Sequence, residues 1–237
     1  MTGAAKTVCI DFLAESVSRY RDDHAIVAVD VIRATTTAVT AASLGFRCFP
    51  VASLEHAVPL AARLERPLLV GELGGNTPYG FDLTNSPAQL TQVTELDRPI
   101  VLLSSSGSGL MFEAQAAQAG YAACLRNYDS VGRHLAANHD RVAVIGAGTR
   151  GEFREEDQLC CAWVAALLVD AGFAPAGGQT AALVERWRGQ PAERIVESRS
   201  ATYLRDSGQL ADLDFILAHV ADLDEVYAVR DGELVRA

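Results

Sequence analysis

A short segment after an apolar run combines an acid, a cation and three hydroxyls. Residues 30–37 read Asp-Val-Ile-Arg-Ala-Thr-Thr-Thr. If the threonines open a helix, its free N–H groups and the positive end of its dipole favour an anion, and a guanidinium adds donors that match phosphate oxygens. We predict Asp30 and Arg33 as catalytic residues and Thr35, Thr36 and Thr37 as substrate ligands. The alternative is that the threonines only cap the helix and Arg33 pairs with a surface carboxylate.

A long glycine-rich loop follows another apolar run. Residues 71–87 read Gly-Glu-Leu-Gly-Gly-Asn-Thr-Pro-Tyr-Gly-Phe-Asp-Leu-Thr-Asn-Ser-Pro. Loops of this length are uncommon in compact domains and are often functional. We predict that Glu72 is catalytic and that Glu72 and Asp82 ligate a hard cation such as Mg²⁺. Asn85 and Ser86 are predicted substrate ligands, unless they cap the next helix on a surface loop.

Two further polar turns follow apolar runs. Residues 104–109, Ser-Ser-Ser-Gly-Ser-Gly, leave backbone N–H groups exposed at a helix start, so Ser104, Ser105 and Ser106 are predicted anion ligands. Residues 146–157 contain three glycines and end in Glu-Glu-Asp. We predict that Asp157 points inward to a metal. Acids at this position also suit the dipole of a first helical turn, which is the alternative.

The elements that position these turns alternate along the chain. Apolar runs of strand length occupy residues 8–12, 25–31, 46–51, 67–70, 100–103, 122–125 and 142–145, and helical patterns occupy 34–44, 54–64, 109–119, 130–137 and 155–171. This alternation predicts βαβ crossovers, and therefore a layered α/β/α fold with a largely parallel or mixed sheet. Residues 180–221 are mostly helical in pattern, and 226–235 predict a short hairpin or edge strand. Ligands of such sheets bind beyond the carboxyl ends of the strands.

Composition narrows the class of protein. The chain has 237 residues, is 49% hydrophobic and carries a formal net charge of −10. A negative chain is a poor partner for nucleic acid, and no apolar stretch is long enough to cross a membrane. The five cysteines lack zinc-type spacing, so we expect a reducing cytoplasm. We expect one α/β domain over residues 1–237, with 174–179 as the place for any sub-division. The oligomeric state stays open, a homodimer included.

The motifs also occur in a familiar order. They are Val-Asp-Val-Ile-Arg-Ala-Thr-Thr-Thr at 29–37, Gly-Glu-Leu-Gly-Gly at 71–75, Gly-Phe-Asp-Leu-Thr-Asn-Ser-Pro at 80–87, and Ala-Gly-Thr-x-Gly-x-Phe at 147–153 with Glu-Asp at 156–157. Across residues 8–235 this order resembles the 2-phosphosulfolactate phosphatase family. The resemblance implies a Mg²⁺-dependent acid phosphatase that converts 2-phospho-3-sulfolactate to 3-sulfolactate and phosphate, a step toward coenzyme M. It also implies an α/β fold distinct from the common phosphatase folds.

Two positions depart from the family pattern. Leu73 stands where the family usually has arginine, and the serine-rich segment 104–109 stands where it usually has Asn-Gly-Thr. A substrate with phosphate and sulfonate arms needs several cations, so Leu73 leaves the substrate open. A non-catalytic phospho-ligand-binding relative and a different α/β phosphotransferase are the alternatives.

The working hypothesis for the chemistry centres on Asp30. Mg²⁺ lies between Asp30 and one or two of Glu72, Asp82 and Asp157, and bridges to a phosphate oxygen. The nucleophile is either metal-activated water or Asp30 itself, and the sequence does not choose between them.

Overall fold

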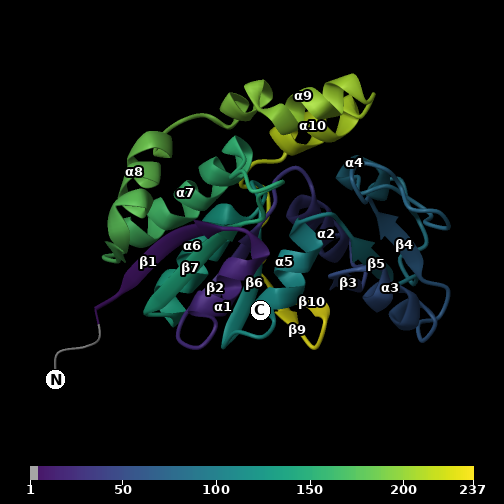
Figure 1. Cartoon of the computed structure of the whole chain (residues 1–237), viewed down its shortest axis with the longest axis horizontal. Helices are drawn as coiled ribbons and strands as arrows, with labels where there is room; N and C mark the ends of the chain where they lie inside the picture. Colours follow the sequence, from purple (N-terminus) through teal and green to yellow (C-terminus); the bar gives the residue numbers. More distant parts are fainter. Residues whose placement is uncertain (1–4) are drawn as a thin grey trace.

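Residues 5–237 are described in the computed structural model, and they form one ten-stranded sheet with helices on both faces (Figure 1). The strands are β1 (Thr7–Phe12), β2 (Ala25–Val29), β3 (Cys48–Val51), β4 (Leu68–Gly71), β5 (Ile100–Leu103), β6 (Ala119–Ala123), β7 (Arg141–Gly146), β8 (Ala174–Pro175), β9 (Tyr227–Arg230) and β10 (Glu233–Arg236). The α-helices are α1 (Val17–Tyr20), α2 (Ala34–Ser43), α3 (Leu54–Ala61), α4 (Pro87–Leu90), α5 (Gly107–Ala114), α6 (Tyr128–Asn138), α7 (Glu155–Asp170), α8 (Gly177–Trp187), α9 (Arg199–Asp206) and α10 (Leu210–Ala218). Two 3₁₀ helices, η1 (Ala14–Ser16) and η2 (Ala192–Glu197), complete the described chain.

The sheet consists of two parallel blocks that run in opposite senses. Its order is β4-β5-β3-β10-β9-β6-β2-β7-β1-β8. Strands β4, β5 and β3 are mutually parallel, and so are β6, β2, β7, β1 and β8. The hairpin β9–β10 joins the blocks through three successive antiparallel pairings, which reverses the direction between them. The expected α/β/α fold with a largely parallel, mixed sheet is confirmed.

The position of this hairpin differs from the prediction of an edge strand. Residues 227–236 do form a hairpin, but it lies in the middle of the sheet. Ala228, Val229 and Leu234 are buried between the layers, so both strands have apolar cover. The short length of the segment suggested an edge, whereas its pairing with β3 and β6 depends on partners far away in the sequence.

Twist brings the carboxyl ends of the two blocks together. Six strand steps separate β2 from β4, and at about 20–25° per step these strands differ in direction by roughly 120–150°. Helices α2 and α5 lie in the resulting concavity, where each contacts strands of both blocks. The ends of β2 and β5 therefore feed helices that lie side by side.

Apolar side chains fill both faces of the sheet. Helices α6, α7 and α8 pack on one face of β7, β2 and β1, and α2 and α5 pack on the other. Every residue of β2 is buried, as expected for a strand covered on both faces. Helix α3 covers β5 in a smaller cluster around Val101 and Leu103.

Some element boundaries differ from those expected. The helix predicted at 109–119 is α5, which spans Gly107–Ala114, and the following strand β6 begins at Ala119 rather than at 122. An alanine-rich run fits helix or strand equally well, and pairing with β2 settles the choice. The segment 174–179 joins α7 to α8 and adds the two-residue strand β8 beside β1.

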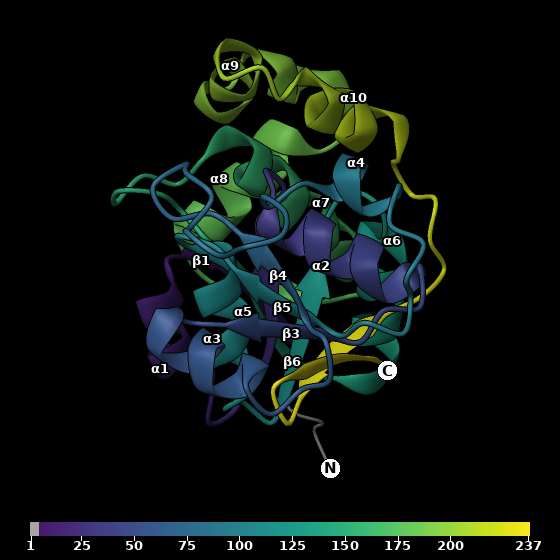
Figure 2. The same cartoon turned by 90° about the vertical axis from the view of Figure 1, so that its right-hand side faces the viewer.

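The C-terminal third is largely helical, as predicted. Helices α9 and α10 lie above the sheet, with α4 beneath α10 (Figure 2). None of the helices in the described chain has the length and apolar character that a bilayer crossing requires.

Candidate active site

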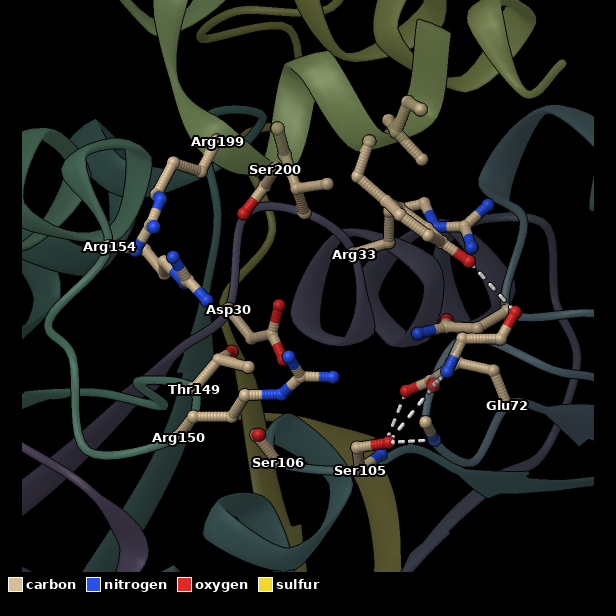
Figure 3. A pocket seen from close by; sticks show the side chains of 16 residues that line it. Asp30, Arg33, Glu72, Ser105, Ser106, Thr149, Arg150, Arg154, Arg199 and Ser200 are labelled. Carbon is tan, nitrogen blue, oxygen red and sulfur yellow. Dashed lines mark hydrogen bonds between the residues drawn. The ribbon is translucent and has the colours of Figure 1, made fainter. Parts of the chain in front are cut away.

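A cavity of ≈ 380 Å³ lies where the ends of β2, β4, β5 and β7 face helix α9 (Figure 3). Polar side chains from the turns after these strands form part of its wall, and side chains of α9 form another part. The described residues that line it are Asp30, Ile32, Arg33, Glu72, Gly74, Gly75, Asn85, Ser105, Ser106, Thr149, Arg150, Arg154, Arg199, Ser200, Tyr203 and Leu204. The four polar turns predicted from the sequence therefore contribute to one cavity.

Asp30 is the buried carboxylate of this cavity. Asp30 follows β2 directly and is 8% exposed. Burial, together with the charges of Glu72 and Glu156, raises the pKa of Asp30 to about 7, and the Ala34 N–H group and Arg33 oppose this rise. A carboxyl group with a pKa near neutrality can exchange a proton in the physiological range.

Gly107 allows the start of α5 to approach Asp30. A Cβ atom at Gly107 would lie 2.1 Å from Asp30 Oδ2 and 2.6 Å from the Cβ of Ala34. Only glycine fits between these groups. The first turns of α2 and α5 therefore both lie beside this carboxylate, where their free N–H groups favour negative charge.

The three threonines after Asp30 are placed outside the cavity. Thr35 Oγ1 accepts from the Asp30 N–H and donates to the Asp30 carbonyl, both at 2.8 Å, and the Thr36 hydroxyl donates to the Val31 carbonyl at 2.8 Å. Thr37 is 1% exposed, and its hydroxyl has no partner among the described residues. Two of the three hydroxyls thus fix the turn that carries Asp30, and neither the predicted substrate role nor a side-chain cap of α2 is seen for them.

Glu72 holds the glycine-rich loop to the start of α5. Its Oε1 accepts from the Ser105 N–H at 2.8 Å, and its Oε2 accepts from the Gly75 N–H at 2.8 Å and from the Ser105 hydroxyl at 3.0 Å. The Gly74 N–H donates to Ser105 Oγ at 2.7 Å. Glu72 and Ser105 both line the cavity, so this network forms one of its walls.

The other predicted polar ligands divide between the cavity and the scaffold. Ser106 and Asn85 line the cavity; Asn85 is 3% exposed, and its Oδ1 has no partner within residues 5–237. Ser104 exchanges hydrogen bonds with Ser108 at the start of α5. Ser86 caps α4 by accepting from the Gln89 N–H at 3.1 Å.

Arg33 lines the cavity and is paired with a carboxylate that the sequence did not single out. Its Nη1 donates to Asp212 Oδ2, and both side chains are 4% exposed. Asp212 lies on α10 and also accepts from the Ser86 hydroxyl at 2.5 Å and the Ala88 N–H at 3.1 Å. The C-terminal helices are therefore tied to the anion-binding turn.

Three further cavity arginines were missed by the sequence reasoning. Arg150 and Arg154 belong to the glycine-containing turn after β7, and Arg199 begins α9. The first two lie within a segment that had been singled out only for Asp157. Nothing near Arg199 in the sequence distinguishes it, because its role depends on where α9 packs.

Two predicted metal ligands do not line the cavity. Asp82 accepts from the Leu69 N–H at 2.8 Å and lies 3.8 Å from the Arg98 guanidinium. Asp157 is 3% exposed and accepts from the Val31 N–H at 2.8 Å. Burial and then the charge of Asp30 raise its pKa well above the ordinary range. Asp157 thus stabilises the turn after Asp30 through its hydrogen bond with the Val31 N–H group.

The donor set can be compared with the needs of a metal. No group of three histidine, cysteine, aspartate or glutamate side chains suited to a metal occurs in the part of the chain that the structure describes. Asp30 and Glu72 are two oxygen donors on one cavity. Mg²⁺ is commonly held by one or two carboxylates together with substrate phosphate and water. Two carboxylates therefore fit Mg²⁺, whereas an ion that takes all its ligands from protein would need more donors.

An acid of raised pKa and four arginines around one cavity of the described chain define an α/β enzyme site for a small, strongly anionic ligand. The family model described as 2-phosphosulpholactate phosphatase matches residues 12–230, and the chain belongs to this family of phosphoric monoester hydrolases.

Individual relatives are similar over most of their length. A protein of Pseudothermotoga lettingae is 34% identical over 205 residues, which cover 86% of this chain and 88% of its own. One of Deinococcus radiodurans is 32% identical over 211 residues, covering 87% and 86%. One of Synechococcus sp. is 30% identical over 223 residues, covering 91% of each chain. All three carry the name "Probable 2-phosphosulfolactate phosphatase".

Proposed function

We propose that this chain hydrolyses the phosphate ester of 2-phospho-3-sulfolactate, giving 3-sulfolactate and inorganic phosphate with consumption of one water. The observation that carries the proposal is Asp30, a buried carboxyl with a pKa of about 7, facing a cavity lined by arginines. The printed names of the relatives supply the substrate. A soluble, cytoplasmic enzyme that needs no nucleic acid partner is part of the same proposal.

The charge of the cavity supports a substrate with several acidic groups. Phosphosulfolactate carries a phosphate, a sulfonate and a carboxylate. Among the residues that the structure describes, Arg33, Arg150, Arg154 and Arg199 line the cavity. Leu73, which stands where the family usually has arginine, is not among the described residues that line the cavity. The four arginines therefore supply the positive charge of the cavity without it. Guanidinium groups beside a developing phosphoryl charge are a main source of phosphatase rate enhancement, and we assign this role to Arg33, which lies on the same turn as Asp30.

Asp30 has two possible chemical roles at the phosphorus. In one, its carboxylate attacks phosphorus to form an aspartyl-phosphate, which water then hydrolyses. In the other, water attacks and Asp30 accepts its proton, for which a pKa of about 7 is well suited. A rapidly quenched single turnover separates the roles, because only the first leaves a phosphoryl group on the peptide that carries Asp30.

Other cavity groups bind and orient the ester. Asn85 is buried and its Oδ1 has no hydrogen-bond partner among the described residues, so this oxygen is free to accept from a protonated oxygen of the substrate. Ser106 lies at the start of α5 beside Asp30 and adds a hydroxyl donor.

We also propose that Asp30 and Glu72 hold Mg²⁺. The ion would offset the negative charge of the phosphate and of the two carboxylates when it is bound. The two side chains share a cavity, and the charge of Glu72 already raises the pKa of Asp30, so a cation between them would be stabilised.

A phosphatase screen tests the proposal. The purified chain is assayed with phosphosulfolactate and other phosphorylated hydroxy acids, with Mg²⁺ and with a chelator, beside Asp30→Asn. We expect turnover of phosphosulfolactate with Mg²⁺ and loss of at least about a thousandfold in Asp30→Asn. Full activity in Asp30→Asn would contradict the assignment of Asp30, and binding of the esters without turnover would contradict the hydrolase function.

A further inference from the structure

Two cavity arginines, Arg154 and Arg199, bind the same glutamate, and Arg150 lies near enough for its charge to act on that glutamate. Glu152 Oε2 accepts from Arg154 Nη1 at 2.9 Å and from Arg199 Nη1 at 2.5 Å. The hydrogen bond and charge of Arg199 lower the pKa of Glu152, and the charges of Arg154 and Arg150 lower it further. Two guanidinium groups of the cavity therefore already share one oxyanion, with the charge of a third nearby.

The three arginines come from two parts of the fold, the segment between β7 and α7 and the start of α9. Arg150 lies at the tip of the turn 149–152, with a φ of 54°, and Gly151 follows with a φ of 77°. Thr149 and Glu152 exchange backbone hydrogen bonds at 2.9 and 3.1 Å, as in a type I′ turn. Arg154 precedes α7, and Arg199 is the first residue of α9. The turn and α9 therefore form the cluster together.

The cluster has donors to spare. The Arg154 side chain is 16% exposed, and its Nε is buried with no partner among residues 5–237. Arg150 forms no ion pair within the described chain. An unpaired buried N–H group costs free energy, which a bound oxyanion would recover.

The cluster is separate from the groups around the phosphate end. In the view of Figure 3, Arg154 and Arg199 lie on one side of Asp30 and Arg33 and Glu72 lie on the other, while the Arg150 side chain extends toward Asp30. Arg33 is paired with the buried Asp212, whereas the ion-pair partner of Arg154 and Arg199 is Glu152, whose side chain is 53% exposed. An exposed ion pair is weak and readily exchanged.

We propose that Arg150, Arg154 and Arg199 form a second anion subsite, which binds the sulfonate of the substrate in place of the Glu152 carboxylate. The inference rests on the proposed function for the phosphate end of the cavity. A sulfonate is always ionised and has three oxygens, so it can accept from several guanidinium groups that approach from different directions, here from the segment after β7 and from α9. A carboxylate offers two coplanar oxygens, which suit one bidentate arginine.

The subsite makes the enzyme selective for phosphate esters that carry a second strong acid. The test compares three esters that differ only at that arm: phosphosulfolactate, 2-phosphomalate with a carboxylate, and 2-phospholactate with a methyl group. The variants are Arg154→Met and Arg199→Met. The control is Arg21→Met, which removes a half-exposed surface arginine paired only loosely with Asp22.

We expect each cavity variant to lower kcat/KM for phosphosulfolactate by about tenfold to a hundredfold, because a charged hydrogen bond contributes about 1.5–3 kcal/mol. The value for 2-phospholactate should change by less than about twofold, and Arg21→Met should change neither. A proportional loss for all three esters, or no loss for any, would overturn the subsite. Wild-type enzyme that prefers phosphomalate would assign the cluster to a carboxylate and overturn the sulfonate.

A direct binding measurement separates this inference from the proposed function. Calorimetry with 3-sulfolactate needs no turnover, and Arg199 is 75% exposed, so its variant is expected to fold. If no ester is hydrolysed, the phosphatase function fails, and the subsite then stands or falls on calorimetry alone. Weaker 3-sulfolactate binding in Arg199→Met than in Arg21→Met supports it, and equal binding overturns it.

Discussion

The Arg33 guanidinium and the Asp212 carboxylate form a buried ion pair between residues that are 179 positions apart. Arg33 lies on the cavity and Asp212 lies on α10, so the pair connects the anion site to the C-terminal helices. Asp212 also binds Ser86 at the start of α4. One side chain thus fixes a cavity cation and two helices.

Asp212→Asn is expected to lower both stability and activity. Removing one partner of a buried ion pair typically costs about 3–5 kcal/mol, because the remaining charge is left unpaired. Arg33 would also lose its orientation, and kcat/KM should fall by about tenfold or more after correction for the folded fraction. Denaturant unfolding and initial rates measure the two effects.

Asp222→Asn serves as the matched control. Asp222 binds Arg126 through two hydrogen bonds, at 3.0 and 2.7 Å, away from the cavity. This variant should lose stability without a loss of activity per folded molecule. Equal specific activities of the two variants would show that Asp212 has only a structural role.

Asp30→Asn is expected to stabilise the fold at neutral pH while abolishing activity. The pKa of Asp30 rises from 3.8 to about 7 on folding, so the folded state holds the proton more tightly. The contribution of Asp30 to the free energy of unfolding is therefore fully present below about pH 4 and is lost as the pH rises toward 7. The loss amounts to about 1.4 kcal/mol for each unit by which folding shifts the pKa. Asparagine carries no proton to lose, so the variant should not show this loss.

Thermal unfolding of wild type and Asp30→Asn between pH 4 and pH 8, in buffer with a chelator, measures this effect. The two curves should diverge as the pH rises. Curves that stay parallel over this range would mean that Asp30 titrates near its ordinary value.

Glu152→Gln is expected to tighten the binding of 3-sulfolactate. The substitution removes a carboxylate that competes for Arg154 and Arg199, and exposed ion pairs contribute about 0.2–1 kcal/mol, so the Kd should fall by up to about fivefold. Calorimetry at low ionic strength measures the change. The control Glu155→Gln breaks the exposed pair with Arg186 instead. Weaker binding in Glu152→Gln would mean that the glutamate organises the arginines rather than competing for them.

Gly107→Ala is expected to disable the site. The added methyl group would lie 2.1 Å from Asp30 Oδ2, so either Asp30 or α5 must move. A displacement of about 1 Å at a reacting group can cost about a hundredfold in rate. Gly109→Ala lies two residues further along α5, with no atom within 4 Å of its new methyl group. Rates measured side by side should fall only in the first variant, and similar rates would remove the close approach at Gly107 from the mechanism.

The sequence predicted the layers of the fold because the hydrophobic period and the length of each helix or strand are local properties of the chain. The run at 100–103 became β5 with the expected bounds, and the run at 8–12 became β1, which begins one residue earlier at Thr7. The opposite senses of the two parallel blocks were not predictable, since they depend on how the hairpin 227–236 pairs with β3 and β6.

The candidate site shows the same division. Asp30, Arg33 and Glu72 were found because each directly follows a strand or its turn, and the structure brings them to one cavity. Arg199 and Asp212 were missed, because each becomes part of the site only through the packing of α9 and α10. The threonines at 35–37 were assigned to substrate, but two of the hydroxyls bind the neighbouring backbone.

The central position of the β9–β10 hairpin has a consequence for the synthesis of the protein on the ribosome. The hairpin follows every other strand in the sequence, so β3 and β6 keep unpaired edges until residues 227–236 have emerged. Exposed strand edges are sites of mispairing between chains. A nascent chain can form each block early, but the two blocks can join into one sheet only after this hairpin has been translated.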